Sequence, residues 1–271
     1  RITYPLLAAV YLAPLGEVTS LDFSLFVAGP TGSQKTEMTA IAQAHYGAEF
    51  NGGNLPGNWS STANTLEKQA FLAKDALFTV DDFAPTGTIS DVQRLHRDAD
   101  RLLRGQGNRA GRGRMRPDGT LRPTYFPRGI IVSSGEDIPR GQSLRSRNFI
   151  LEVSKGDVDL GRLTKLQNDA AEGRLAQAMA AYIGWLAPQI ASLKARMPER
   201  HSELRAKARE QRVFHDRTPD IVANLAAGWE MFLEFALQAG AITDVERNSL
   251  RDEGWQVLLG ARQASIKGPG H

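Results

Sequence analysis

Cysteine is absent from this chain of 271 residues. A chain without cysteine forms no disulfide framework, no thiolate zinc site and no cysteine nucleophile, which predicts a reducing, cytoplasmic environment. Long apolar runs are missing as well. The longest one near the start, residues 5–15 (PLLAAVYLAPL), is too short to span a bilayer. We therefore expect a protein that does not enter a membrane.

The chain as a whole also carries little net charge. The formal net charge is +3, and 41% of the residues are hydrophobic, which is ample for a packed core. Charge is uneven, however. Residues 101–128 contain eight arginines, no lysine and a single acidic residue, Asp118. A local excess of this size favours an anionic partner.

Short apolar runs alternate with helical patterns in the first part of the chain. Helices are predicted at residues 5–15, from residue 36 onward, at 64–74 with an Asn64/Glu67 capping box, and at 90–104 with a Ser90/Gln93 box. Buried strands are expected at residues 23–28, 76–80, 129–133 and 149–153. This alternation predicts an α/β fold with a parallel sheet covered on both faces.

Beyond residue 157 the pattern changes to long helical periods without a strand signal. Helices are expected at residues 160–197, 202–214, 219–239 and 244–264. We predict two units, a P-loop ATPase core over residues 1–157 and an all-helical lid or C-terminal subdomain over 158–271.

A phosphate-binding loop is the strongest motif. Residues 29–36 read GPTGSQKT, which matches G-x-x-x-x-G-K-[ST] except that Gln34 replaces the last glycine. A strand enters the motif and a helix leaves it, so backbone N–H groups can surround the phosphates of ATP. The predicted nucleotide-binding residues are Gly29, Pro30, Thr31, Gly32, Ser33, Gln34, Lys35 and Thr36.

Acidic and hydroxyl side chains supply the expected chemistry. Lys35 would reach the β- and γ-phosphates, while Thr36 and Asp81, at the end of a neighbouring strand, would hold Mg²⁺. Asp82 would orient or deprotonate the attacking water. Ser134, or Ser133 before it, would contact the γ-phosphate from the end of a third strand.

Each of these interpretations has a simpler alternative. The loop can be an ordinary strand–turn–helix joint, or a degenerate site that binds nucleotide and hydrolyses it poorly, because the Cβ of Gln34 stands where glycine allows unusual dihedral angles. Asp82 can be a turn residue, and the sequence SSGED after the third strand is also good turn composition.

Two further groups of arginines suggest interactions. Arg140, Arg145 and Arg147 precede the fourth strand, and an arginine supplied across a subunit interface neutralises transition-state charge; we place Arg145 and Arg147 among the catalytic candidates. The alternative for each of the three is a solvated basic turn. In the Gly/Arg segment, residues 105–128, Asp118-Gly119 predicts a hairpin turn. Its alternative is a solvated loop. The predicted DNA-binding residues are Arg112, Arg114, Arg116 and Arg122, with Tyr125 or Phe126 stacking on a base.

The order of these motifs resembles a family of P-loop ATPases from phages, plasmids and integrated elements, uncharacterised, helicase-like and often attached to primase modules. The resemblance covers residues 4–153. It is carried by the phosphate loop, by NWSSTANTLEKQA with Trp59, by VDDF, by the Gly/Arg segment with its Asp-Gly, and by SSGE followed by GQSLRSRN.

This resemblance implies an AAA+-like or superfamily 3-like ATPase that works as a ring, expected to be a hexamer, on single-stranded or forked DNA during replication. An arginine of the next subunit would complete each nucleotide site. The first hypothesis is therefore a DNA helicase or translocase of a mobile element, using ATP and Mg²⁺. A nucleotide-dependent switch or assembly scaffold with slow turnover is the second, and a small-molecule kinase is a weaker third.

Overall fold

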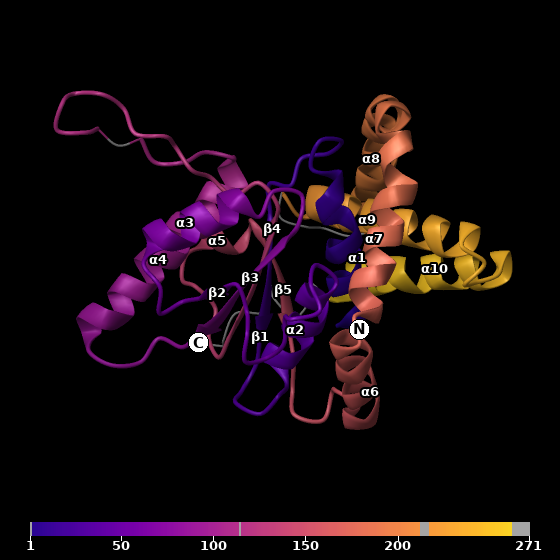
Figure 1. Ribbon diagram of the computed structural model, residues 1–271, viewed down its shortest axis with the longest axis horizontal. Coiled ribbons are helices and arrows are strands. Elements are labelled where there is room, and N and C mark those ends of the chain that lie inside the picture. The colour runs from indigo at the N-terminus through magenta and orange to yellow at the C-terminus, as the bar shows by residue number, and fades with distance from the viewer. Residues whose placement is uncertain (1, 114, 212–216, 262–271) are drawn as a thin grey trace.

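A sheet of five parallel strands forms the centre of the molecule (Figure 1). The computed structural model describes residues 2–113, 115–211 and 217–261. The strand order is β2-β3-β4-β1-β5. The strands are β1 (Ser24–Ala28), β2 (Gly57–Asn58), β3 (Leu77–Phe83), β4 (Ile130–Gly135) and β5 (Asn148–Glu152). The predicted parallel α/β sheet is confirmed, and β2 is a short strand in addition to the four expected ones.

Helices cover both faces of the sheet, as the apolar strands require. Side chains alternate along β1, so that Phe26 packs in one buried cluster while Leu25 and Val27 pack in the other. The first cluster lies under α3 (Ala63–Leu72), α4 (Ile89–Asn108) and the short α5 (Gln142–Arg145). The second lies under α1 (Thr3–Leu12, continued by a 3₁₀ turn at Ala13–Leu15) and α2 (Lys35–Ala44).

The rest of the chain is helical, as predicted. It forms α6 (Leu160–Ala171), α7 (Arg174–Leu186), a 3₁₀ turn (Ala187–Gln189), α8 (Ile190–Gln211), α9 (Thr218–Gln238) and α10 (Asp244–Ala261). Helices α7, α9 and α10 contact α1, whereas α6 packs against α2 and α8 against α9. The Tyr182 hydroxyl donates to the Tyr11 carbonyl at 2.9 Å, and a Cβ on Gly228 of α9 would lie 2.5 Å from the Ala8 carbonyl oxygen.

One buried cluster therefore joins the start of the chain, the sheet and the last helices. It runs without interruption across residue 157, so no gap in the core marks the expected division into 1–157 and 158–271. That division stays a prediction.

The predicted starts of two helices are wrong by a few residues. The α3 cap is Thr62, whose hydroxyl accepts from the Thr65 N–H at 3.3 Å. Asn64 and Glu67 instead accept hydrogen bonds from Arg101 of α4, an interaction that local sequence does not reveal. At α4 the capping box is formed by Thr88 and Asp91 rather than by Ser90 and Gln93, whereas the box of Thr243 and Glu246 at α10 is present.

The end of α4 also lies beyond its predicted position at residue 104. Gly105 and Gly107 continue the helix instead of ending it. A Cβ at Gly107 would lie 2.4 Å from the Arg147 Cδ, so the glycine serves close packing. Buried Gln106 donates to the Gly129 carbonyl at 2.9 Å, and the helix ends where Arg109 takes a left-handed conformation.

Within the described residues, no helix combines the length and the apolar character that crossing a membrane requires.

Candidate nucleotide-binding site

The phosphate loop connects β1 to α2 at the carboxyl edge of the sheet. Glycine is required at its first position, because a Cβ on Gly29 would lie 2.1 Å from the Val153 carbonyl oxygen. Gly32 has φ +80°, a conformation that side chains disfavour. The Ser33 N–H donates to the Pro30 carbonyl at 3.2 Å and tightens the turn. The strand, turn and helix therefore form the predicted joint.

Gln34 occupies a conformation that suits glycine. Its φ and ψ are 66° and 23°, in the left-handed region, immediately before the first residue of α2. A non-glycine residue there costs about 1–2 kcal/mol. The backbone strain that the missing glycine predicts is present. It lies at the start of α2, beside the cleft.

We expect Gln34→Gly to stabilise the fold by about 0.5–1 kcal/mol, because relief of the strain exceeds the entropy that glycine gains in the unfolded chain. Gln34→Ala keeps the Cβ and serves as the matched control, with an expected change within about 0.5 kcal/mol. Chemical denaturation measures both. Equal stabilisation by the two variants would assign the effect to the glutamine side chain and not to the backbone.

Lys35 and Thr36, the first residues of α2, face the cleft from its loop side. The Lys35 ammonium donates to the Pro30 carbonyl at 2.9 Å. The Thr36 hydroxyl lies 3.1 Å from each oxygen of Asp81. This contact joins residues 45 positions apart, and it brings together the two side chains predicted to hold a metal.

Asp81 comes from β3, which is not adjacent to the strand of the phosphate loop. Strand β4 lies between β1 and β3, so the expectation of a neighbouring strand is corrected. The intervening strand contributes Ser134, whose hydroxyl donates to Asp81 Oδ1. Ser134 is fully buried and does not line the cleft. The structure therefore places it behind Asp81, where it orients the carboxylate.

Ser133 points to the opposite face of β4. Its hydroxyl donates to the Val80 carbonyl at 3.0 Å and accepts the Trp59 indole N–H at 2.7 Å. Trp59 is buried and packs edge-on against Phe83, with ring centroids 5.6 Å apart. Trp59, which distinguishes the motif NWSSTANTLEKQA, thus links β2 to β3 and β4.

Asp82 lies at a bulge in β3. The register of β3 with β4 shifts between Val80 and Phe83, and Asp82 has φ 68°. The bulge leaves its carboxylate exposed and directs it into the cleft. Aspartate tolerates this conformation better than most residues, which accounts for an acid at that position.

Glu136 was not identified from the sequence. It follows β4 directly, its N–H donates to the Phe83 carbonyl at 3.1 Å, and its carboxylate accepts a hydrogen bond from the Thr31 hydroxyl of the phosphate loop. The acidic residue of the motif SSGE was the sequence signal that could have identified Glu136. The cleft has a volume of about 280 Å³ and is lined by Thr31, Gly32, Gln34, Lys35, Thr36, Glu37, Asp81, Asp82, Gly135 and Glu136.

The cleft suits Mg²⁺ better than a transition metal. Thr36 and Asp81 offer a hydroxyl and a carboxylate, and magnesium binds through such oxygens while keeping several waters. Among the described residues there is no group of three or more His, Cys, Asp or Glu side chains that could hold a metal alone. A site completed by phosphate and water is consistent with this donor set.

A second cavity, of about 650 Å³, lies along α2 on the side of α1 and α6. Its walls include Leu6, Met38 and Leu163, with His45 at one end. Burial lowers the pKa of His45, so the neutral ring is favoured. Lys155 passes beside the phosphate loop, with its Cε 3.8 Å from the place of a Cβ on Gly32. Charged residues also line the cavity, namely Glu152, Asp157, Asp159 and Arg162, and its apolar part suits a planar ring.

Arg145 and Arg147 lie at the opposite edge of the sheet. Asn148, which follows them, pairs with Ser24 at the start of β1, whereas the phosphate loop follows Ala28 at its end. A strand of this length separates them by roughly 15 Å. They are therefore not assembled with this chain's own cleft.

Arg147 belongs to a group of clustered positive charges. It donates to the Ser143 carbonyl at 2.7 Å and to Asn108 Oδ1 at 3.1 Å. Its Nε is buried and has no hydrogen-bond partner among the described residues. Burial first, and then the charges of Arg217 and Arg104, lower the pKa of Arg147. An anion bound beside Arg147 would accept a hydrogen bond from its Nε and would offset the neighbouring positive charges.

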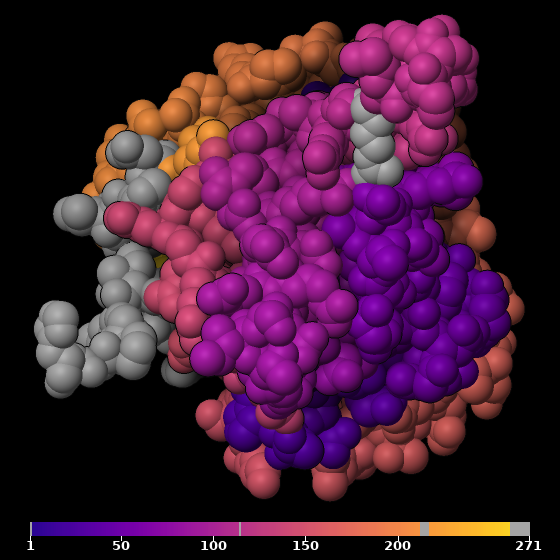
Figure 2. Space-filling model, turned by 90° about the vertical axis from the view of Figure 1, so that its left-hand side faces the viewer, coloured from indigo at the N-terminus to yellow at the C-terminus, as the bar shows by residue number. Residues whose placement is uncertain are grey.

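The Gly/Arg segment leaves the end of α4 at the same edge and stands out from the surface formed by α3 and α4 (Figures 1 and 2). The predicted turn is present: Arg116 N–H donates to the Thr120 carbonyl at 2.7 Å, and Met115 pairs antiparallel with Leu121. The side chains of Arg112, Arg116 and Arg122 are exposed. Arg114 lies outside the described residues.

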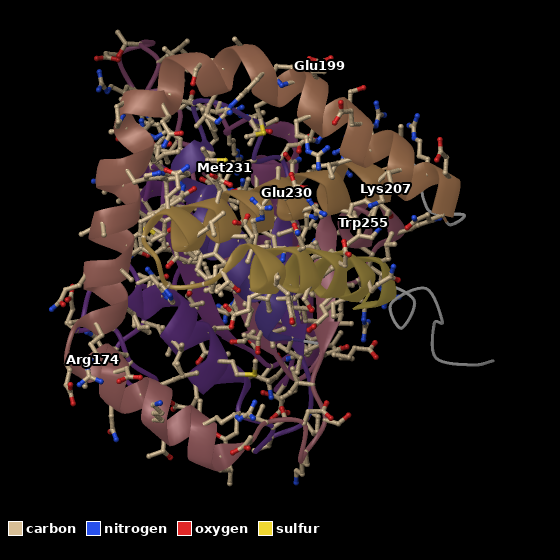
Figure 3. All side chains as sticks on the ribbon, turned by 90° about the vertical axis from the view of Figure 1, so that its right-hand side faces the viewer. Arg174, Glu199, Lys207, Glu230, Met231 and Trp255 are labelled. Atoms are coloured by element: carbon tan, nitrogen blue, oxygen red, sulfur yellow. The ribbon has the colours of Figure 1, made fainter. Side chains whose placement is uncertain are left out.

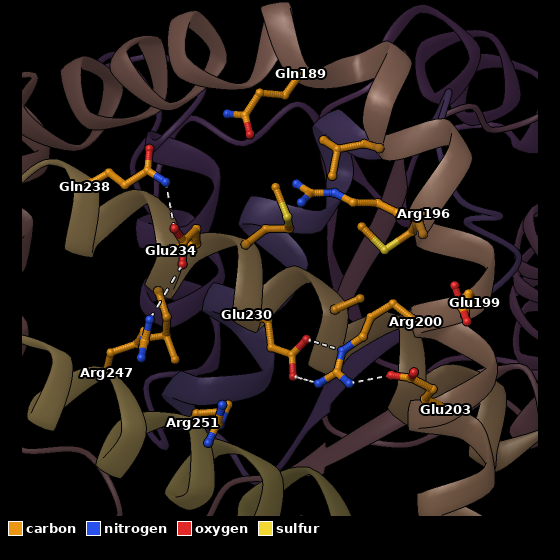
Figure 4. Close-up of a pocket in the computed structure, with 15 residues that line it drawn as sticks. Gln189, Arg196, Glu199, Arg200, Glu203, Glu230, Glu234, Gln238, Arg247 and Arg251 are labelled. Carbon is orange, nitrogen blue, oxygen red and sulfur yellow. Dashed lines mark hydrogen bonds and ion pairs between the residues drawn. The ribbon is translucent and has the colours of Figure 1, made fainter.

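A third cavity, of about 580 Å³, lies far from this chemistry between α8, α9 and α10 (Figures 3 and 4). Its floor is apolar and includes Met231. Arg200 crosses it and donates to Glu230 at 2.9 Å and to Glu203 at 2.7 Å. These ion pairs hold α8 to α9, so the charged residues there have a structural explanation.

Comparisons with known proteins agree with the fold. No protein-family model matches the chain, and no curated protein does. Among solved structures it is similar to "SCCmec type IV Cch - active helicase", with a TM-score of 0.60 and 14% identity over 96% of this chain and 47% of that one. The chain thus spans about half of that structure. JCV helicase is a more distant neighbour, with a TM-score of 0.36, 15% identity, and coverage of 84% and 66%.

Proposed function

We propose that this chain is the ATPase part of a DNA helicase or translocase of a mobile genetic element. The observation that carries the proposal is the contact of Thr36 with Asp81 at 3.1 Å, which assembles loop, metal ligands and Asp82 in one cleft. The fold likeness to a helicase structure supports the class of protein. Function in replication follows from the sequence resemblance.

The residues of the cleft have separate roles in ATP hydrolysis. The backbone N–H groups of the loop and the N-terminus of α2 hold the phosphates, and Lys35 neutralises them. Thr36 and Asp81 hold Mg²⁺, which when bound supplies positive charge to the phosphate oxygens. Asp82 accepts a proton from the attacking water. Ser134 keeps Asp81 in position, in place of the γ-phosphate contact expected from sequence.

The adenine ring would occupy the apolar cavity beside α2. This cavity and the cleft share the α2 helix, with Met38 facing the cavity and Lys35 the cleft. The polar cleft would hold the phosphates, and the cavity would hold the purine. Because the nucleotide would occupy both, the cleft alone is small for a whole nucleotide.

Self-association would complete the site. Because Arg145 and Arg147 lie at the far edge of the sheet, they can serve a cleft only when it belongs to another subunit. Arg147 is half-buried, and its Nε has no hydrogen-bond partner among the described residues, which suits this side chain to meet phosphate. A ring, expected to be a hexamer, provides this arrangement.

DNA would bind to the exposed arginines of the Gly/Arg segment. Replacing Arg112, Arg116 and Arg122 together by alanine should weaken single-strand binding and lower the slope of log affinity against log salt by about 2, since each phosphate contact contributes roughly 0.7. Fluorescence anisotropy over a salt series measures this. The matched triple lysine variant should keep the slope. An unchanged slope in the alanine variant would reassign the segment to a solvated loop.

ATP hydrolysis with and without DNA, together with a mass measurement in a nonhydrolysable nucleotide, tests the proposal as a whole. We expect DNA to stimulate turnover and nucleotide to promote assembly. A protein that hydrolyses ATP equally with and without DNA and stays monomeric would contradict it.

One observation favours a second candidate, a nucleotide-dependent switch with slow turnover. The strained Gln34 forms part of the cleft wall, and a loop displaced from the usual geometry can bind phosphates without aligning them for attack.

A further inference from the structure

Two large apolar side chains lie largely exposed at the tip of the Gly/Arg segment. Met115 is 67% exposed and Leu121 is 74% exposed. They face each other across an antiparallel bridge. The turn between them is closed by the Arg116–Thr120 backbone bond at 2.7 Å and by Asp118, which accepts the Thr120 N–H at 2.9 Å. The pair is thus held together by the backbone.

The hairpin tip has two chemically different faces. Residues opposite each other in an antiparallel pair share a face, and their neighbours in sequence point the other way. Met115 and Leu121 therefore form an apolar face, while Arg116 and Arg122 lie on the opposite, basic face.

The aromatic residues that were expected to stack on a base have another use. Tyr125 packs on Phe71 of α3 with ring centroids 5.1 Å apart, and Phe126 does so at 6.3 Å. The Arg128 guanidinium covers the same ring at 3.7 Å. These contacts fix the base of the hairpin to α3. Base contacts must then come from elsewhere on the segment.

We propose that Met115 and Leu121 form an apolar wedge that packs against unpaired nucleobases, while the basic face holds the sugar–phosphate backbone. The inference rests on the proposed DNA-binding function and names the part of the nucleic acid that the tip reads. Charge complementarity selects the occupant, because the exposed Arg112, Arg116 and Arg122 belong to the same segment and attract a polyanion where an ordinary apolar protein surface is not attracted. Methionine and leucine are among the side chains that enter between stacked bases.

Serine at both positions tests the wedge. Because both side chains are exposed, M115S/L121S should fold normally, which thermal unfolding verifies. With a single strand containing 2-aminopurine, we expect the native protein to change the fluorescence and the serine variant to lose most of that change. Affinity should fall roughly ten- to a hundredfold, as removal of two buried apolar contacts implies, with an unchanged salt slope because no arginine is lost.

Two further variants complete the experiment. The exchange M115L/L121M keeps the apolar face and should retain the fluorescence change. V245S removes an apolar side chain that is 79% exposed on α10 and should have no effect. Native fluorescence and affinity in M115S/L121S would overturn the wedge, as would loss of self-association instead of base contact, measured by sedimentation. Failure of the native protein to bind DNA would instead refute the proposed function.

Discussion

Lys35→Ala is expected to reduce ATP hydrolysis by a factor of about a thousand or more and ATP affinity by roughly a hundredfold, since fixed donors to phosphate contribute effects of this size. The composition of the cleft explains the magnitude. Among the described residues that line the cleft, Lys35 is the one basic side chain. Four acidic side chains line it as well: Glu37, Asp81, Asp82 and Glu136. Without the ammonium, the triphosphate would meet only carboxylates and backbone N–H groups.

Binding of a fluorescent ATP analogue and release of phosphate measure the two effects. Lys155→Ala is the matched control, because it removes the same charge from a side chain that passes beside the loop but does not line the cleft. It should change turnover only a few-fold. If both variants lost activity equally, general electrostatics and not a specific phosphate contact would be responsible.

Asp82→Asn should lower kcat by about a hundred- to ten-thousandfold, the range for loss of a general base, while ATP affinity changes little. Asparagine is the informative replacement because it adopts the left-handed conformation of Asp82 readily, so the bulge is preserved. Single-turnover hydrolysis and equilibrium binding separate the two quantities. Asp137→Asn, which neutralises an exposed acid next to Glu136, is the control.

The same variant distinguishes the two candidate functions. A motor loses strand unwinding with Asp82→Asn, whereas a nucleotide-dependent switch keeps ATP-dependent DNA binding or assembly. Undiminished turnover in Asp82→Asn would show that Asp82 is a turn residue. Glu136, which reaches the same cleft, would then become the candidate base.

Sequence was informative where the chemistry is local. The phosphate loop, its entering strand and its leaving helix are contiguous, so hydrophobic pattern and glycine placement predicted them. Asp81 was found because it ends a buried apolar run. The left-handed conformation at position 34 followed from one missing glycine, and the Asp118-Gly119 turn from its dipeptide.

Contacts between residues that lie far apart in the chain could not be predicted from the sequence. Thr31 meets Glu136 across 105 positions, and Trp59 meets Ser133 across 74. Neither spacing is visible in a periodic pattern. The place of β4 between β1 and β3 has the same cause, since strand order depends on how crossovers pack. It explains why Ser134 lies behind Asp81. The cap of α3 was misplaced for a separate reason, because Asn64 and Glu67 accept hydrogen bonds from Arg101 of α4.

The packing of α1 against α9 has a consequence for how the protein is made. Residues 3–12 emerge from the ribosome well before residues 218–238, which cover their buried surface. At bacterial-to-eukaryotic synthesis rates of about 5–20 residues per second, that delay is roughly 10–40 seconds. During this interval an apolar helix and one face of the nascent sheet lack their covering. The growing chain is therefore a natural client for a chaperone that shields apolar segments until residues 218–238 have been made.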